Sequence, residues 1–375
     1  MNPSIFRSFV PLAFAVLAAG SAAPAVVLDI QANVTADVQE VAGGSILNSD
    51  HAFSQFDLTT HTLPLVAEAR LLPPEAAQTT VVTDVAADAT ARFSDPRVNQ
   101  SESPNEFALS VIGFSASTTS TVTGDSLAVE TRQVVFQADE VGIAADTPVT
   151  ARSHFFLDGI LILLARPGST GLAGASTELD IHVIQTRTGQ DPTTVLEAIV
   201  VLTGNADGTA TLTVNGALVA DDVTTFGASG VSLAGGTFQA AVLSNLAIAY
   251  EYPANIGETF QLEAQVETKF NAAPGTGGAV ILGDQINQLI ATLVGVLGQD
   301  VVSNFATGLT SGLSGVTLSL KPVVAAEQDT VLTPVATSGQ GLPLLNGRAC
   351  GLMGAESAML AGGLAALCLI GRRRI

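Results

Sequence analysis

The 375-residue sequence predicts an all-β fold built as an antiparallel β-sandwich, with one or two such sandwiches in the chain. The main observation is strict alternation of apolar and polar residues, which is typical of strands that bury one face. Turn residues separate these runs, and Thr and Val, which fit pleated surfaces, are frequent within them. Strands of this kind favour sheets that each pack one face on a shared core.

Two alternating runs are the clearest strand predictions. The run 28–39 places six apolar residues on one face: Leu28, Ile30, Ala32, Val34, Ala36 and Val38. The run 260–270 does the same with Phe260, Leu262, Ala264, Val266 and Phe270, and only Thr268 interrupts its apolar face. Shorter copies predict further strands at 107–111, 127–136, 179–183, 210–214 and 316–321.

Turn residues predict a β-meander from 194 to 219. Asn205-Ala206-Asp207-Gly208 predicts a turn that leads into the strand 210–214. Asn215-Gly216 predicts a two-residue hairpin between 213–214 and 217–218.

One segment has helical rather than strand spacing. Its apolar residues are Ile286, Leu289, Ile290, Leu293, Val294, Leu297, Val301 and Phe305. Asp284 is a suitable N-cap, and the spacing predicts an amphipathic helix from about 284 to 297. We expect this inserted helix to cover a sheet edge. The alternative is a helix that binds a partner.

The two ends of the chain predict export and membrane insertion. Residues 1–25 combine Arg7, an apolar run and Ala23-Pro24-Ala25, which predicts a signal peptide cleaved after Ala25. The apolar run 352–370 is long enough to span a bilayer, and Arg372, Arg373 and Arg374 follow it. This pattern predicts a C-terminal transmembrane helix with the bulk of the chain outside the cytoplasm. An ordinary membrane anchor is the alternative to a processed tail.

The tail over 350–375 resembles bacterial C-terminal sorting signals of the PEP-CTERM type. The resemblance rests on Glu356-Ser357-Ala358-Met359-Leu360, the apolar helix and the Arg cluster, although no Pro flanks Glu356. Cys350-Gly351 resembles related tails that carry a Cys just before the helix. The resemblance implies recognition by an exosortase-like membrane transpeptidase, cleavage near Cys350 and transfer to a surface anchor.

The exported β-sandwich region is expected over 26–324, with a possible division near residue 150. A Pro- and Gly-containing linker is expected over 325–349. Both cysteines, Cys350 and Cys368, lie in the tail, so the exported region has no disulfides. Packing and backbone pairing must therefore stabilise it.

Charge and motifs exclude several classes of function. The formal net charge is −20, and a chain this acidic repels nucleic acid. The sequence has no H-E-x-x-H motif, P-loop, dinucleotide fingerprint or nucleophile elbow, so we expect a protein that is not an enzyme. His51, His61, His154 and His182 are expected to be surface or hydrogen-bonded residues rather than metal ligands.

Calcium is the one ion that the sequence suggests. Asn205, Asp207 and Gly208 match part of a calcium loop, although Thr203 holds the first ligand position and the distal Glu is missing. Asp221 and Asp222 would supply further carboxylates. Plain turn residues are the main alternative, because tight turns select Asn, Asp and Gly for backbone reasons. No other cofactor is expected.

These observations predict an exported, surface-anchored protein of the cell envelope with a structural or adhesive role. Its expected partners are the membrane, a sorting transpeptidase and extracellular polysaccharide. One alternative is a module that binds polysaccharide or calcium. Another is a hydrolase whose carboxylates come together from separate strands.

Overall fold

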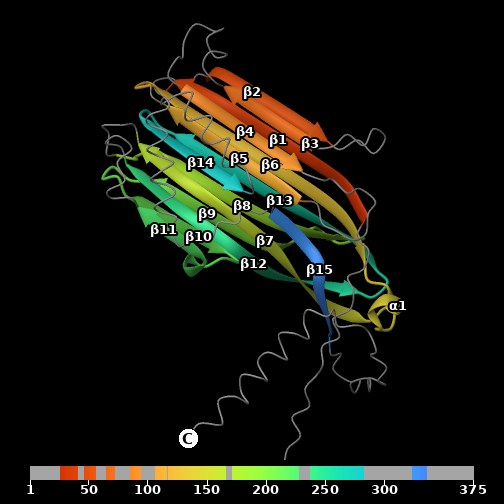
Figure 1. The fold of residues 1–375 in the computed structure, drawn as a ribbon. Helices are drawn as coiled ribbons and strands as arrows, with labels where there is room; N and C mark the ends of the chain where they lie inside the picture. The colour runs from red at the N-terminus through yellow and green to blue at the C-terminus, as the bar shows by residue number, and fades with distance from the viewer. Residues whose placement is uncertain are drawn as a thin grey trace, which may run out of the picture. The chain divides into compact units, whose positions relative to one another are not determined.

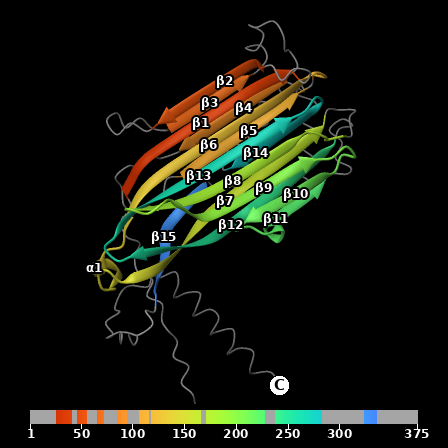
Figure 2. The same ribbon diagram turned by 180° about the vertical axis from the view of Figure 1, so that it is seen from behind.

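The computed structural model describes residues 26–40, 46–55, 65–71, 85–93, 106–115, 117–165, 171–227, 237–282 and 323–335. These residues form two antiparallel sheets stacked face to face, which confirms the all-β prediction and is consistent with a β-sandwich (Figures 1 and 2). The helical elements among them are two short ones, α1 (Ala138–Val141) and the 3₁₀ turn η2 (Ala220–Asp222).

Sheet A has the strand order β10-β9-β8-β13-β6-β1-β2. Its members are β1 (Val26–Glu40), β2 (Ile46–Gln55), β6 (Ser120–Val135), β8 (Ser176–Arg187), β9 (Thr193–Gly204), β10 (Ala210–Gly216) and β13 (Thr259–Ala272). The runs predicted at 28–39, 179–183, 210–214 and 260–270 lie in these strands, and the run at 127–136 lies in β6 except for its last residue.

Sheet B has the strand order β11-β12-β7-β14-β5-β4-β3, and β15 pairs with β5 and β7. Its members are β3 (Leu65–Leu71), β4 (Val85–Phe93), β5 (Glu106–Ser115), β7 (Pro148–Ala165), β11 (Val223–Gly227), β12 (Phe238–Asn255), β14 (Thr276–Leu282) and β15 (Val323–Pro334). The run predicted at 107–111 lies in β5.

Alternate residues of each sheet fill a single core between the two sheets. In β13 every second residue from Phe260 to Ala272 is buried, including Thr268, as the alternation predicted. Phe270 packs closely against two glycines. Its ring lies directly over Gly124 in the neighbouring strand β6 and over Gly113 in β5 of the opposite sheet. A side chain at either glycine would overlap the ring, so the two sheets approach one another here only because both residues are glycine.

The hairpin predicted at Asn215-Gly216 is wrong. These residues are the last two of β10, which pairs with β9 along its length. The chain then passes through η2 into β11 of sheet B instead of adding a strand to sheet A. Gly216 has a φ of 79°, and the amide of Ala217 donates a hydrogen bond to the carbonyl of Glu197. The Asn-Gly pair therefore redirects the chain between sheets. The turn predicted at 205–208 is confirmed, because it joins β9 to β10.

Two segment boundaries predicted from the sequence differ from the strands of the structure. Strand β6 pairs with β13 and β5 pairs with β14, so no boundary near residue 150 divides the described strands. Strand β15 occupies 323–334, so it takes up the first part of the segment expected to be a linker over 325–349.

Several predictions lie outside the described residues. They are the signal peptide, the helix at 284–297, the strand at 316–321, the rest of the linker and the tail over 350–375. Within the described part of the chain, no helix has the length and apolar character needed to cross a membrane.

Candidate functional site

The outer face of sheet A, turned away from the core, gathers charged side chains from four neighbouring strands. Strand register aligns them in rows across the sheet. One row consists of Thr35, Asp125, Lys269 and Glu178, from β1, β6, β13 and β8. The next consists of Asn33, Leu127, Glu267 and Asp180. The rows bring together carboxylates and one ammonium group that are far apart in the sequence.

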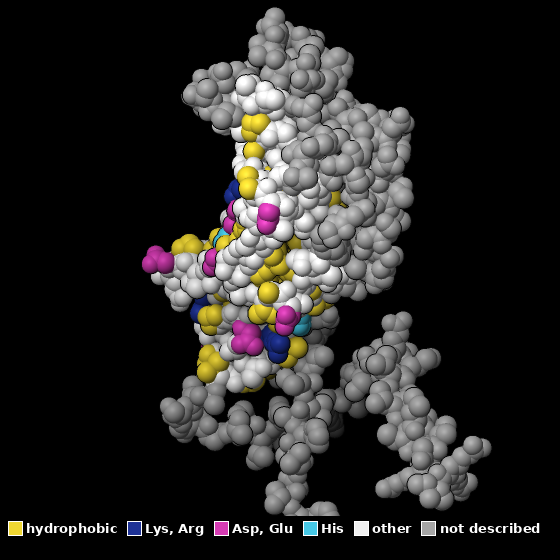
Figure 3. Space-filling model, turned by 90° about the vertical axis from the view of Figure 1, so that its left-hand side faces the viewer, with side chains coloured by type: hydrophobic (Ala, Val, Ile, Leu, Met, Phe, Trp, Pro, Cys, Tyr) yellow, Lys and Arg dark blue, Asp and Glu magenta, His cyan; other side chains and the backbone are white. Residues whose placement is uncertain are grey.

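An open depression of about 380 Å³ lies over these rows. The residues that line it supply hydroxyl, amide and charged groups together with a larger area of apolar atoms: Thr35, Asp37, Thr123, Gly124, Asp125, Ser176, Glu178, Lys269, Phe270 and Asn271. The surface in the side view of the molecule is likewise mixed, with acidic and basic side chains dispersed among uncharged ones (Figure 3). The depression is therefore an open hollow on a solvent-facing sheet, and three of its four charged lining residues are acidic.

Asp125 and Glu267 are coupled carboxyl groups within this site. Burial, together with a hydrogen bond to Glu267 and its negative charge, raises the pKa of Asp125 to about 7, against the opposing charge of Lys269. Burial also acts to raise the pKa of Glu267, but hydrogen bonds from Asp125 and Lys269 outweigh it and hold that pKa below its ordinary value. The neutral Asp125 carboxyl therefore keeps its proton and acts as the hydrogen-bond donor to the Glu267 carboxylate, and the two groups titrate as a coupled pair.

Lys269 neutralises part of this charge. Its Nζ lies 2.5 Å from Glu267 Oε2 and 3.7 Å from Glu178 Oε1. Burial acts to lower the pKa of Lys269, but the hydrogen bond and charge of Glu267 outweigh it, so that this pKa rises. The ammonium group thus stays charged, and it bridges β13 to β8 on the outer face.

The direct interaction between the two carboxyl groups does not favour glycoside hydrolysis. That chemistry uses two carboxyl groups about 5–10 Å apart, with room between them for a sugar carbon or a water. Asp125 and Glu267 instead interact with each other strongly enough to raise the pKa of Asp125 and lower that of Glu267. Such an arrangement suits contacts with a polar, hydrated ligand better than an acid–base reaction that needs water excluded.

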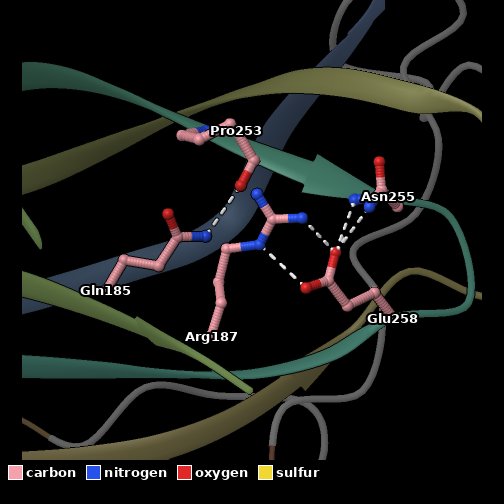
Figure 4. Close-up of polar contacts among 5 residues, drawn as sticks. All are labelled: Gln185, Arg187, Pro253, Asn255 and Glu258. Atoms are coloured by element: carbon pink, nitrogen blue, oxygen red, sulfur yellow. Dashed lines mark hydrogen bonds and ion pairs between the residues drawn. The ribbon is translucent and has the colours of Figure 1, made fainter. Parts of the chain in front are cut away.

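A second polar cluster joins the two sheets at one end of the sandwich (Figure 4). Gln185 Nε2 in β8 donates to the carbonyl of Pro253 in β12 at 2.8 Å. Arg187, also in β8, donates Nε to Glu258 Oε1 at 2.8 Å and Nη2 to Glu258 Oε2 at 2.5 Å. Glu258 Oε2 also accepts from the backbone and side-chain amides of Asn255. We call these five residues the inter-sheet clasp.

Hydrogen bonding sets the protonation of the clasp. The bond from Arg187 holds the pKa of Glu258 below its ordinary value, against the effect of burial. The bond to Glu258 raises the pKa of Arg187 above its ordinary value. Both groups are therefore charged and mutually satisfied, which fits a stabilising role rather than a reactive one.

The calcium candidates lie at two separate places. Asn205 and Asp207 are in the β9–β10 turn, while Asp221 and Asp222 are in η2 beyond the far end of β10. Seven residues of strand put the two turns roughly 20 Å apart, so the four residues do not converge on one ion. No group of three or more His, Cys, Asp or Glu suited to a metal occurs within the described residues.

Local hydrogen bonds account for these turn residues. Asp207 Oδ1 accepts from the backbone amide and the hydroxyl of Thr209, at 3.0 and 2.6 Å. Asn205 Nδ2 donates to Thr209 Oγ1 at 3.0 Å. Asp222 Oδ2 accepts from the amide of Val219 at 2.9 Å. These are the contacts by which Asn and Asp shape tight turns without a ligand.

The remaining candidates are scattered. His51 lies on β2 and is exposed, and His154 stacks on Phe156 with ring centroids 6.3 Å apart. His182 Nε2 is 2.8 Å from Asp180 Oδ1 on the outer face of sheet A. His61 and the processing residues Ala25, Cys350, Glu356, Arg372, Arg373 and Arg374 lie outside the described residues.

The fold and this face define a two-sheet antiparallel β-sandwich protein with an acidic, solvent-facing sheet. No protein-family model matches the sequence, and no curated protein matches it either. Among solved structures, one titled "Structure of infectious bursal disease virus Gt strain" is 11% identical and has a TM-score of 0.12. The match covers 70% of this chain and 62% of that chain, and a similarity at this level carries no argument about function.

Proposed function

We propose that the protein is exported, is held at the cell surface through its C-terminal tail, and serves there as a structural or adhesive β-sandwich. The observation that carries the proposal is the layout of the tail: an apolar run over 352–370 closed by Arg372, Arg373 and Arg374. The export signal at the other end of the sequence agrees with it.

The character of the exported region supports the same role. It has no cysteines between residues 26 and 349, so it needs no disulfide to persist in an oxidising compartment. The outer face of sheet A presents carboxylates, amides and hydroxyls. These groups keep the surface hydrated, and the carboxylates repel nucleic acid. These properties suit a protein that meets hydrated polymers or neighbouring cell-surface proteins.

Deleting 372–374 tests the proposal in the producing cell. We expect the deletion to release the protein or to leave it in another fraction, because the basic stop that orients the tail is lost. The matched control replaces Arg372, Arg373 and Arg374 with Lys, which keeps the charge and the localisation. Unchanged fractionation of the deletion variant would contradict the proposal. Intact mass of the mature protein then locates both cuts, which we expect after Ala25 and near Cys350.

Polysaccharide binding is a second candidate, favoured by the lining of the depression on sheet A. Hydroxyl, amide and carboxylate groups converge there from Thr35, Asp125, Ser176, Glu178 and Asn271. Groups of these kinds form hydrogen bonds with sugar hydroxyls. A glycan array probed with wild type and with Glu178→Ala tests it: we expect binding that the substitution weakens about tenfold, as loss of one charged hydrogen bond predicts. An array without hits for the wild type would remove this candidate.

A further inference from the structure

The central part of sheet B, residues 108–115, 157–165, 240–243 and 276–282, is buried on both of its faces. One set of alternating residues, such as Leu109, Leu161 and Val280, belongs to the core shared with sheet A. The other set points away from sheet A, and in this central part its members have exposed fractions of 6% or less and include the polar Ser110 and Asp158. Its apolar members come from β5, β7, β12 and β14: Ala108, Ile112, Phe114, Ile160, Ile162, Leu164, Phe238, Ala240, Val242, Ala279 and Ile281. We call this surface the outer apolar face.

None of the described strands covers the outer apolar face, because each belongs to sheet A or to sheet B itself. A surface with eleven buried apolar side chains has to lie against other apolar groups. The layer that covers it therefore comes from a part of the chain outside the described residues or from another molecule.

The path of the chain identifies a candidate. Strand β14 runs beside β7 and ends where Leu282 pairs with Gly159. Strand β15 continues in the same direction beside β7, and its Val324 pairs with Phe156. The two strands thus lie one after the other along the same side of β7. Residues 283–322 connect them, so this connection starts beside Gly159 and ends beside Phe156. This segment begins and ends next to the outer apolar face.

The sequence of residues 283–322 contains apolar residues suited to packing on the outer apolar face. Apolar residues recur at helical spacing from Ile286 to Leu297 and continue to Phe305. The segment 94–105, which joins β4 to β5, offers a single aliphatic residue, Val98, for comparison. We propose that residues 283–322 pack their apolar side on the outer apolar face of sheet B and so add a third layer to the sandwich. This places the amphipathic segment over a sheet face, where the sequence alone favoured a sheet edge.

A cross-linking experiment on the full chain tests the proposal. Cys350 and Cys368 are replaced by Ser, and Ile162→Cys is combined with Leu293→Cys. We expect a bismaleimide that spans about 10 Å, the spacing of packed layers, to join the two thiols within one chain. The matched control combines Leu293→Cys with Thr123→Cys, which lies on the outer face of sheet A, and we expect no such product from it.

Other outcomes overturn the proposal. A covalent dimer whose yield rises with protein concentration would show that a second copy occupies the face. Rapid maleimide labelling of the I162C thiol in folded protein would show that the face is open.

A stability measurement gives an independent test. Leu293→Asp places a charge on the apolar side of the segment, whereas Gln288→Asp places the same charge on its polar side. We expect Leu293→Asp to lower the melting temperature by about 5 °C or more and Gln288→Asp to leave it within about 1 °C. Equal melting temperatures for the two variants would contradict the packing.

Discussion

Asp125 lies where a carboxyl group is difficult to ionise, partly buried beside Glu267 on the outer face of sheet A. Its pKa of about 7 is well above the ordinary value of 3.8. Between these two pH values the folded protein holds a proton that the unfolded chain releases. Asp125 therefore contributes stability that is fully present below about pH 3.8 and is lost as the pH rises through about 7.

Asp125→Asn should remove this pH dependence. The amide stays neutral and still donates a hydrogen bond to the Glu267 carboxylate, so the variant keeps the contact at every pH. We expect the urea midpoint of the wild type to fall between pH 5 and pH 8, and that of the variant to fall less. Glu267 affects stability in a different pH range. Its pKa is lowered from 4.5 in the folded protein, so the stability that it contributes is present above about pH 4.5 and is lost as the pH falls through the folded pKa.

The control for this experiment is Asp37→Asn. It removes one negative charge from the lining of the same depression and leaves the pair of Asp125 and Glu267 in place. Its urea midpoint should follow the pH dependence of the wild type. If Asp125→Asn and the wild type lost stability equally between pH 5 and pH 8, the assignment of the raised pKa to Asp125 would be wrong.

Phe270 should be the most costly residue to truncate among the core side chains of β13. Its ring fills the space that Gly113 and Gly124 leave open, so Phe270→Ala creates a cavity between the sheets. We expect a loss of about 3–5 kcal/mol in the free energy of unfolding, measured by urea titration.

A nearby substitution should have the opposite sign. Thr268, two residues earlier on the same buried face, has an Oγ1 atom that makes no hydrogen bond within the described residues. Thr268→Val removes this hydroxyl at nearly constant volume, and we expect it to stabilise the protein by about 1 kcal/mol. A larger loss from Thr268→Val than from Phe270→Ala would contradict this account of the core.

At the scale of elements, alternation predicted mainly strands that have one polar face, and the run at 107–111 in the doubly buried β5 is the exception. β1, β6, β8 and β13 lie in sheet A, whose outer side meets solvent, so period-two patterning identified them. The segments 157–165 and 238–243 gave no such signal, because β7 and β12 are apolar on both faces there. A continuous apolar run does not distinguish a doubly buried strand from a helix. The sequence therefore predicted the exposed sheet well and the covered sheet poorly.

The candidate site shows a related limit. Glu267 and Lys269 were recognisable as polar positions of an alternating strand, but their contact with Asp125 depends on the pairing of β13 with β6. The 142 and 144 residues that separate Asp125 from Glu267 and Lys269 in the sequence give no local signal of that register. The Asn215-Gly216 pair shows a third limit. Asn-Gly is compatible with a hairpin and equally with the bend by which the chain leaves β10 for sheet B, so the residue types alone do not distinguish the two.

The inter-sheet clasp should stabilise the end of the sandwich where β8 meets β12. Arg187→Met removes both bonds to Glu258 and leaves that carboxylate with the Asn255 amides alone. We expect a loss of about 1 kcal/mol in the free energy of unfolding at pH 7, because the pair is partly accessible to solvent.

The loss from Arg187→Met should also depend on pH. Since the pKa of Glu258 is lowered in the folded state, its contribution is present above about 4.5 and is lost as the pH falls through the folded value. The difference between variant and wild type should therefore shrink in acid. Arg152→Met, at an exposed position of β7, is the control and should be close to neutral. A difference that grew in acid would rule out the ion pair as the cause.

For the whole molecule, strand pairing links distant parts of the chain across residue 150. β6 lies between β1 and β13 in sheet A, and in sheet B β14 lies between β5 and β7. Each half of the chain thus supplies neighbours that the other half needs, and neither sheet is complete without both. Pairings at such separation make folding slow, because loop closure precedes the contacts that offset its entropy.

Separate expression of residues 26–147 and 148–335 tests this dependence. Each half would expose the long edge of β6, β5, β13 or β14 together with half of the core, and unpaired edges of this kind aggregate. We expect neither half to unfold cooperatively in urea on its own, whereas the joined region 26–335 gives one sigmoidal transition by circular dichroism. Mixing the halves during refolding is the control, since it supplies every strand pair without the covalent link. A cooperative transition from either half alone would show that the two sheets contain an independent domain, and that the division near residue 150 is real.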